Sequence, residues 1–159
     1  MKKSSFLTLL VAIALTACGP KYIINESRDL PNGEWAYNDT LRFTFAIADT
    51  LKLYDLFVEI EHAADYPWQN LYTRIYTEFP DGQRLHKPLS LELSDQLGQW
   101  QGRCRSDRCT VRIPIQQGAY FNQAGAYAIT LEQYMRVNPV PGVQRVALQI
   151  VELASTLEN

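Results

Sequence analysis

Hydrophobic and polar side chains alternate with a period of two along most of the chain after residue 33. In residues 41–47, for example, Leu41, Phe43 and Phe45 are separated by polar or small residues. The other segments that share the alternation are residues 56–61, 71–78, 89–93, 111–115, 127–131 and 146–150. This period is typical of antiparallel strands with one buried and one solvated face. The pattern therefore predicts an all-β fold, an antiparallel β-sandwich of the jelly-roll or immunoglobulin-like kind.

Turn residues and prolines separate these segments. A Pro-Asp-Gly sequence at residues 80–82 predicts a turn between two strands. Pro88 and Pro114 fall inside or at the start of strand-like runs, and proline has no N–H to donate to a sheet. We therefore expect both prolines on edge strands or at bulges. Only residues 131–137 have a pattern compatible with a helical turn.

The first eighteen residues resemble a bacterial lipoprotein export signal. Lys2 and Lys3 supply its positive region, and residues 6–16 form an apolar stretch that is too short to span a bilayer. The stretch leads into Leu-Thr-Ala-Cys, which is similar to a lipobox ending at Cys18. In such proteins the cysteine thiol receives a diacylglyceryl group and becomes the first residue after cleavage. The alternative is an ordinary secretory signal with a cysteine near the cleavage point.

Acylation of Cys18 would keep the protein on a membrane, because two or more acyl chains hold a protein stably where one does not. We expect residues 1–17 to be a cleaved signal peptide, 18–33 a lipidated tether, 34–153 the β-sandwich and 154–159 a C-terminal tail. Neither an aspartate nor an acidic cluster follows the cysteine directly. These features mark inner-membrane retention and surface export, so we expect an outer-membrane lipoprotein that faces the periplasm.

Composition narrows the classes of function. The chain of 159 residues is 47% hydrophobic and 20% charged, with a formal net charge of −2, which is a globular composition. A general nucleic-acid binder needs a basic face, so we expect no nucleic-acid partner. The sequence contains no apolar run of about eighteen residues or more, so we expect no permanent transmembrane helix.

Cys104 and Cys109 flank a polar turn between two strand-like runs. Oxidation is the default state of such a pair in an exported chain, and a disulfide would clip a hairpin. The chain-entropy model gives about 2 kcal/mol for closing so short a loop. Free thiols and a metal site are the alternatives, although a lone cysteine pair without a nearby histidine is weak for zinc. We expect no cofactor and no metal.

Residue types that carry catalysis are scarce. His62 beside Glu61, with Asp65 near, has the composition of a minimal acid–base unit, but no nucleophile motif accompanies it. Asp49 and Asp55 have the composition of a hydrolase pair, but aspartate is common in the hairpin-like turn that they flank. We favour a structural histidine at a polar loop rim and solvated carboxylates. The sequence therefore predicts a protein that is not an enzyme.

The segment 66–72 is the strongest candidate for a binding surface. It gathers three aromatic rings and an amide, from Tyr66, Trp68, Asn70 and Tyr72. Tyrosine and tryptophan are enriched at binding surfaces because one end is apolar and the other forms hydrogen bonds. The same rings are equally suited to closing one end of the sandwich. Arg136 is a further candidate, either in a structural ion pair or as a fork for a partner.

A series of landmarks runs along the chain in a definite order. They are Cys18, Tyr66-Pro67, Asn70-Leu71, Pro80-Asp81-Gly82, Leu93, Asp95, Gly98, Trp100, Gly102, Gly125, Tyr127, Glu132-Gln133, Met135-Arg136, Gly142 and Val146-Ala147-Leu148. Together they resemble the gliding motility lipoprotein GldH family of Bacteroidetes over residues 35–153. Cys104 and Cys109 depart from the family pattern, which has a glycine-rich hairpin at this point.

The resemblance implies a lipid-anchored, non-enzymatic envelope component of the gliding and type IX secretion-associated machinery. Such a component acts as an adaptor through contacts with other envelope proteins, and family members also occur in species that do not glide. The alternative is a sandwich that binds glycan or peptidoglycan fragments on Tyr66, Trp68 and Tyr72. Thr40 and Thr50 each lie between aspartate and leucine, which resembles the O-glycosylation sites of Bacteroidetes periplasmic proteins.

Overall fold

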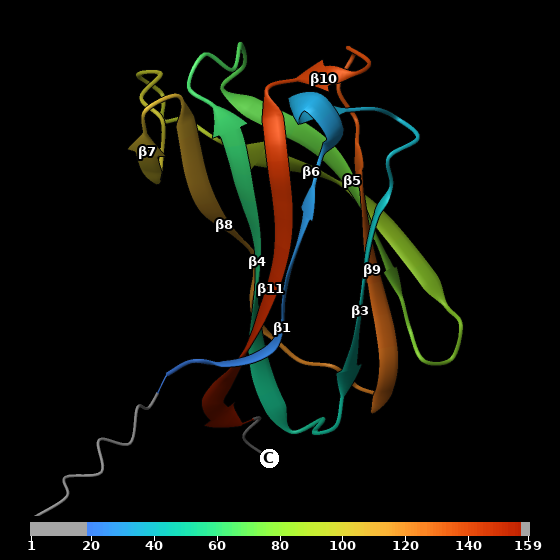
Figure 1. The fold of residues 1–159 in the computed structure, drawn as a ribbon. Helices are drawn as coiled ribbons and strands as arrows, with labels where there is room; N and C mark the ends of the chain where they lie inside the picture. The colour runs from blue at the N-terminus through green and yellow to red at the C-terminus, as the bar shows by residue number, and fades with distance from the viewer. Residues whose placement is uncertain (1–18, 157–159) are drawn as a thin grey trace, which may run out of the picture.

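Two β-sheets pack face to face in a computed structural model that describes residues 19–156 (Figure 1). The elements in chain order are β1 (Lys21–Asp29), the 3₁₀ turn η1 (Pro31–Gly33), β2 (Glu34–Trp35), β3 (Leu41–Ile47), β4 (Lys52–Ala63), β5 (Asn70–Glu78), β6 (Arg84–Glu92), β7 (Arg103–Arg105), β8 (Arg108–Ala119), β9 (Gly125–Gln133), β10 (Val140–Pro141) and β11 (Val143–Thr156). The predicted signal peptide and Cys18 lie outside the described residues. No helix within residues 19–156 is long and apolar enough to cross a membrane.

The strand order is that of a jelly roll. The larger sheet has the order β1-β11-β4-β8-β7 and the smaller has the order β3-β9-β5-β6, while β10 and β2 form a short separate pair. Numbered one to eight in chain order, the longer strands form sheets 1-8-3-6 and 2-7-4-5, in which two Greek keys share one core. The predicted all-β antiparallel sandwich is therefore confirmed, and the order selects the jelly roll over the immunoglobulin-like form.

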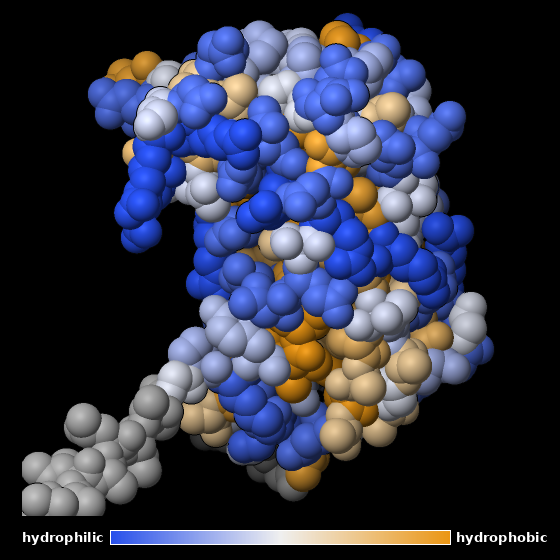
Figure 2. All heavy atoms as spheres, viewed as in Figure 1, coloured by the Kyte–Doolittle hydropathy of each residue, from blue (hydrophilic) through white to orange (hydrophobic). Residues whose placement is uncertain are grey.

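The alternation along each strand determines which side chains enter the core. In β3 every second residue is buried and the residues between them are exposed. Phe43 faces Ile129 across the β3–β9 pair, and Val58 faces Leu148 across the β4–β11 pair. All four side chains are at most 1% exposed. Figure 2 accordingly shows a mostly hydrophilic surface, with hydrophobic side chains visible in the gap between the sheets.

The structure corrects the predicted tether of residues 18–33. Lys21–Asp29 forms strand β1 and pairs with β11 over its whole length, up to the pair of Asp29 with Arg145. Ile24 is the only residue of β1 in the buried core, so this strand lacks the alternation that identified the others. Its extended conformation is imposed by backbone hydrogen bonds to a partner more than a hundred residues away in the chain.

Two further boundaries differ from the prediction. Strand β9 continues to Gln133, so residues 131–133 are extended and the helical turn expected in residues 131–137 does not form there. Strand β11 continues to Thr156 and includes the first residues of the predicted C-terminal tail. Gln133 lies opposite Thr73 of β5, and Thr156 lies opposite Lys52 of β4. In both segments, pairing with a neighbouring strand decides the conformation.

Both prolines lie where their missing N–H is tolerated. Pro88 is on β6, the edge strand of the smaller sheet, and Pro114 is on β8 beside a register shift in its pairing with β4. The short β7 pairs only with the beginning of β8, so the rest of β8 is also an edge. Between these two edges lies an apolar cavity of about 370 Å³, whose lining includes Leu56, Ile75, Leu89, Ile115 and Ile129.

Gly102 and Gly82 provide a matched pair of turn glycines. Their φ angles are +81° and +84°, both left-handed, but a Cβ on Gly102 would collide with the Thr110 carbonyl oxygen, whereas Gly82 has open space around it. We expect Gly82→Ala to lower the free energy of unfolding by about 1 kcal/mol. Gly102→Ala should lower it by clearly more, because the backbone of β8 must also move. Urea unfolding measures both values, and equal losses would contradict the close approach at Gly102.

Candidate functional site

The structure divides the predicted aromatic surface and places Tyr66 on the inside. Tyr66 is 3% exposed and lies at one end of the sandwich, against the rings of His62 and Trp100. Trp68 is partly buried and meets the Tyr66 ring edge to face, with 5.3 Å between the ring centroids. The role of Tyr66 as an exposed stacking surface is therefore corrected. The ring closes the end of the core, which is the alternative that the sequence left open.

His62 belongs to the same buried cluster and not to a polar loop rim. Its side chain is fully buried, with its ring centroid 4.6 Å from that of Trp100. Nδ1 lies 2.9 Å from the Ala63 carbonyl oxygen and donates to it, while Nε2 has no hydrogen-bond partner among the described residues. Burial lowers the pKa of the imidazole, and the bond to Ala63 opposes this effect only in part. We interpret His62 as a neutral packing element.

Asn70 and Tyr72, on β5, lie on the outer side of the smaller sheet. Asn70 donates from Nδ2 to the Ser90 Oγ at 3.0 Å, so its amide is engaged in a local contact with β6. Tyr72, two residues further along β5, is 50% exposed. Arg136 is exposed in the segment between β9 and β10. The structure thus brings Asn70 and Tyr72 to one face and separates them from the rings of Tyr66 and Trp68.

Tyr72 is part of a larger surface feature, the tyrosine–arginine strip, which consists of Tyr72, Arg74, Tyr76, Arg84 and Tyr134. The backbone N–H of Tyr134 donates to the Tyr72 carbonyl oxygen at 2.7 Å, so these two exposed tyrosines are neighbours. The guanidinium of Arg74 lies 4.2 Å from the centroid of the Tyr134 ring, and that of Arg84 lies 4.3 Å from the centroid of Tyr76. These cation–π contacts hold both arginines against the sheet face.

Ion pairs border the strip at the Arg84 end. Glu78 accepts hydrogen bonds from both terminal nitrogens of Arg42, at 2.7 and 2.8 Å, and lies 3.7 Å from Arg84. The hydrogen bonds from Arg42 lower the pKa of Glu78. Because the groups are exposed, such pairs add little to the stability of the fold. Their effect is to orient the charges beside the aromatic rings.

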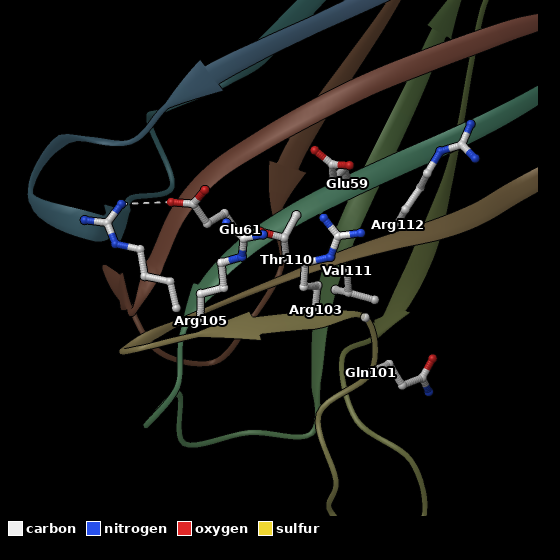
Figure 3. A pocket seen from close by; sticks show the side chains of 10 residues that line it. Glu59, Glu61, Gln101, Arg103, Arg105, Thr110, Val111 and Arg112 are labelled. Carbon is white, nitrogen blue, oxygen red and sulfur yellow. Dashed lines mark hydrogen bonds and ion pairs between the residues drawn. The ribbon is translucent and has the colours of Figure 1, made fainter. Parts of the chain in front are cut away.

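A separate candidate site lies on the outer face of the larger sheet. There, a hollow of about 850 Å³ opens beside the β7–β8 hairpin (Figure 3). Figure 2 shows the surface hollowed next to this strongly hydrophilic hairpin. We call it the arginine hollow, because its lining combines Glu59 and Glu61 with Arg103, Arg105, Arg108 and Arg112. Our sequence reasoning missed this site. The available signal was the alternation of arginine with cysteine in this hairpin.

The predicted disulfide between Cys104 and Cys109 is confirmed, and it explains why the arginines gather on one face. The two cysteines lie opposite each other in the β7–β8 pair, and Cys109 is fully buried. Successive side chains of a strand point to opposite faces, so the arginines next to each cysteine point outward. No group of three or more histidine, cysteine or acidic residues that could hold a metal ion occurs within residues 19–156.

The two predicted O-glycosylation sites lie on either side of β3. Thr40 immediately precedes the strand and is exposed, whereas Thr50 lies in the turn that leads to β4 and is half-buried. Their aspartate neighbours shape the local turns: the carboxylate of Asp49, for example, accepts a hydrogen bond from the Leu51 backbone N–H at 2.9 Å. Both hydroxyls lie in loop segments, and their modification stays a prediction.

These features define a class of protein, a jelly-roll β-sandwich with a tyrosine–arginine strip on the outer face of one sheet and an arginine-lined hollow on that of the other. The model of the family described as "GldH lipoprotein" matches residues 22–150. The chain therefore belongs to the GldH lipoprotein family, which confirms the resemblance found in the sequence. The match begins inside β1 and ends inside β11, so it includes the strand that the sequence pattern had missed.

Individual relatives agree with the family. A gliding motility lipoprotein GldH homolog from Christiangramia forsetii is 27% identical over 142 residues, which cover 89% of this chain and 86% of the relative. The gliding motility lipoprotein GldH from Flavobacterium johnsoniae is 26% identical over 143 residues, covering 89% and 88%. Among solved structures, a CBM28 carbohydrate-binding module specific for non-crystalline cellulose aligns with a TM-score of 0.41 and 13% identity, covering 80% of this chain and 71% of the module. At these values the structural likeness carries no inference about a ligand.

His62 makes the stability of the protein depend on pH in a definite direction. Its pKa in the fold lies below the ordinary value of 6.5, so under acidic conditions the unfolded chain binds a proton that the folded chain does not. The free energy of unfolding should therefore fall as the pH is lowered through about 6.5. His62→Leu should remove this component, and His86→Gln, at an exposed histidine, should retain it. Urea unfolding between about pH 7.5 and pH 5 measures the effect, and an unchanged pH dependence in His62→Leu would contradict it.

Proposed function

We propose that this chain is a lipid-anchored, non-enzymatic component of the gliding motility and type IX secretion-associated envelope machinery, in which it acts as a protein–protein adaptor. Membership of the GldH lipoprotein family supports the class of protein, and the names of both relatives refer to gliding motility. The adaptor role rests on one observation, the exposed tyrosine–arginine strip on the smaller sheet.

The lipobox-like segment ending at Cys18 supports the anchor. Each CH₂ group buried in the bilayer contributes about 0.8 kcal/mol, so a diacylated or triacylated cysteine holds a domain on a membrane without a second signal. The residue after the cysteine is glycine and no acidic cluster follows. This sequence context supports the outer membrane, with the domain on the periplasmic side.

The composition of the strip is that of the centre of a protein interface. Tyrosine and arginine are over-represented among the residues that dominate binding energies. Tyr72 and Tyr134 are 50% and 53% exposed, so a partner would bury substantial aromatic surface on contact. Arg74 and Arg84 are already held against neighbouring rings, which reduces the side-chain entropy lost when a partner binds.

A second candidate function is the binding of glycan or peptidoglycan fragments. The observation that favours it is the pair of neighbouring exposed rings, Tyr72 and Tyr134, since sugar rings have apolar faces that stack on aromatic rings. Protein contact is better supported, because the guanidinium groups of Arg74 and Arg84 already cover one face of Tyr134 and of Tyr76. A sugar cannot stack on a face that a guanidinium covers, so fewer ring faces of the strip are open to it.

Replacing the proposed anchor tests the membrane attachment directly. Cys18→Ser should abolish acylation, because serine offers no thiol to the diacylglyceryl donor. In cells fed an alkyne analogue of palmitate, the wild-type protein should be labelled and should fractionate with outer membranes, while the variant should be unlabelled. A wild-type protein that is unlabelled and freely soluble would exclude the anchor.

Replacing both exposed tyrosines of the strip tests the adaptor role. Interface tyrosines of this kind often contribute about 2 kcal/mol each, so Tyr72→Ser combined with Tyr134→Ser should lower the recovery of partners by roughly tenfold or more. The measurement is affinity purification of the full-length lipoprotein after crosslinking in cells. Tyr22→Ser combined with Tyr120→Ser is the matched control, because these tyrosines are also exposed but lie outside the strip.

The same variants separate the two candidate functions. Recovery of envelope proteins with the wild type and the control, but not with the strip variant, would support the adaptor. Recovery of the wild type alone counts heavily against it. If the wild type instead binds purified muropeptides and the strip variant does not, glycan binding is the better description of this surface.

A further inference from the structure

The arginine hollow lies on the sheet opposite the strip, and two of its four arginines are already engaged. Arg108 donates from Nη1 to a carboxylate oxygen of Glu61 at 2.8 Å. Arg112 donates from Nε to the Gln149 side-chain oxygen at 2.6 Å, and its guanidinium lies over the Phe57 ring. These contacts hold the two side chains in place in the lining of the hollow.

The other two arginines, on β7, stand free. Within residues 19–156, Arg103 and Arg105 form neither an ion pair nor a side-chain hydrogen bond, although both line the hollow. They are alternate residues of one strand, so their Cα atoms are about 7 Å apart. The cysteine between them, Cys104, is tied to Cys109 of the neighbouring strand. The disulfide therefore fixes the backbone from which both guanidinium groups project.

The charge of the hollow is opposite in sign to that of the chain. Four arginines and two glutamates line it, whereas the whole protein has a formal net charge of −2. A guanidinium group binds a carboxylate or a phosphate through two parallel hydrogen bonds. The hollow therefore has the charge and the hydrogen-bond donors to bind an anionic ligand.

The two glutamates in the lining favour separated single charges over a compact dianion. Glu59 and Glu61, on β4, line the hollow beside the arginine-bearing strands β8 and β7 and would repel a phosphate placed next to them (Figure 3). Carboxylates on alternate residues of an extended peptide are also about 7 Å apart. Such a peptide can place one carboxylate at Arg103 and the next at Arg105 on β7, which is separated by β8 from the glutamates of β4.

The position of the hollow disfavours a lipid headgroup as its ligand. Asp29, the last residue of β1, and Glu61 of β4 both pair with Arg145 of β11. The three residues therefore lie at the same height in the sheet. The proposed anchor precedes the first residue of β1, Lys21. A strand of this length measures about 30 Å, so the hollow is at the far end of the domain from the anchored end (Figure 1).

We propose that the arginine hollow binds an extended acidic segment of a partner protein, with carboxylates on alternate residues paired to Arg103 and Arg105. This inference rests on the proposed adaptor function and specifies the chemistry of one partner. The tyrosine–arginine strip is on the other sheet, so the two sites face away from each other. One molecule can then contact two different proteins at once.

A peptide binding experiment tests the proposal. The probe is a fluorescein-labelled peptide of four Glu-Ser repeats, titrated with the full-length acylated lipoprotein in detergent micelles and followed by fluorescence anisotropy. The wild type should bind this peptide and should not bind the matching Gln-Ser peptide. Binding should weaken as salt is raised, because the ion pairs are partly exposed to solvent.

Three double variants assign the binding to the two free arginines. Arg103→Gln with Arg105→Gln should weaken binding by about tenfold or more. Arg103→Lys with Arg105→Lys keeps the charge but loses the two-pronged geometry, so its affinity should be intermediate. Lys21→Gln with Lys52→Gln removes the same charge elsewhere and should bind like the wild type. If the glutamine variant is shown by its thermal melt to be unfolded, the lysine variant carries the test.

Several outcomes would overturn the proposal. These are equal binding of the Gln-Ser peptide, equal affinity of the Arg103→Gln/Arg105→Gln and Lys21→Gln/Lys52→Gln variants, and displacement of the peptide by inorganic phosphate at submillimolar concentration. Failure here is distinct from failure of the adaptor function. If the peptide does not bind but crosslinked partners are still recovered, only the hollow is excluded. If it binds but no partner is recovered from cells, the adaptor role is excluded and the chemistry of the hollow stands.

Discussion

The rest of the structure depends on one constraint, that the strands with an alternating pattern have an apolar face and must bury it against the opposite sheet. Neither sheet by itself can shield that face from water. Strand β11 illustrates the constraint best, because it pairs on both sides, with β1 and β4, and fully buries Val146, Leu148 and Ile150. In strands such as β3, whose inner positions are committed to the core, the positions between them face solvent. Most residues of the two proposed contact sites occupy such outward strand positions.

The local sequence pattern was sufficient to predict strands in which apolar and polar residues alternate. Residues 41–47 form β3 as predicted, and Pro88 and Pro114 lie on edges because a missing N–H has the same consequence in any sheet. The pattern was insufficient for β1. This strand places only Ile24 in the core, and its pairing partner β11 lies at the other end of the chain. Such a strand is specified by its neighbour's free hydrogen-bonding groups, which no local window of sequence contains.

The candidate sites were predictable to a smaller extent, for a related reason. Tyr72 was identified from its own segment, but its neighbour Tyr134 lies on a distant part of the chain and reaches it only through strand pairing. The Tyr66 ring points inward because it packs against the rings of His62 and Trp100, which lie on other segments of the chain. The disulfide was predictable because its two residues are close in sequence. Predicting that the neighbouring arginines share one face also required the register of the hairpin.

The incorporation of β1 into the larger sheet determines how the domain would bear mechanical load. With the anchor proposed at Cys18 and a partner bound at the proposed hollow, tension between the two would enter the sheet at Lys21 and run along the axis of β1. Tension in this direction shears the whole β1–β11 ladder, so its hydrogen bonds share the force and do not open one after another. If residues 18–33 formed the tether expected from the sequence, the same tension would only extend that segment. The lifetime of the domain under tension is then set by its unfolding rate and not by its equilibrium stability.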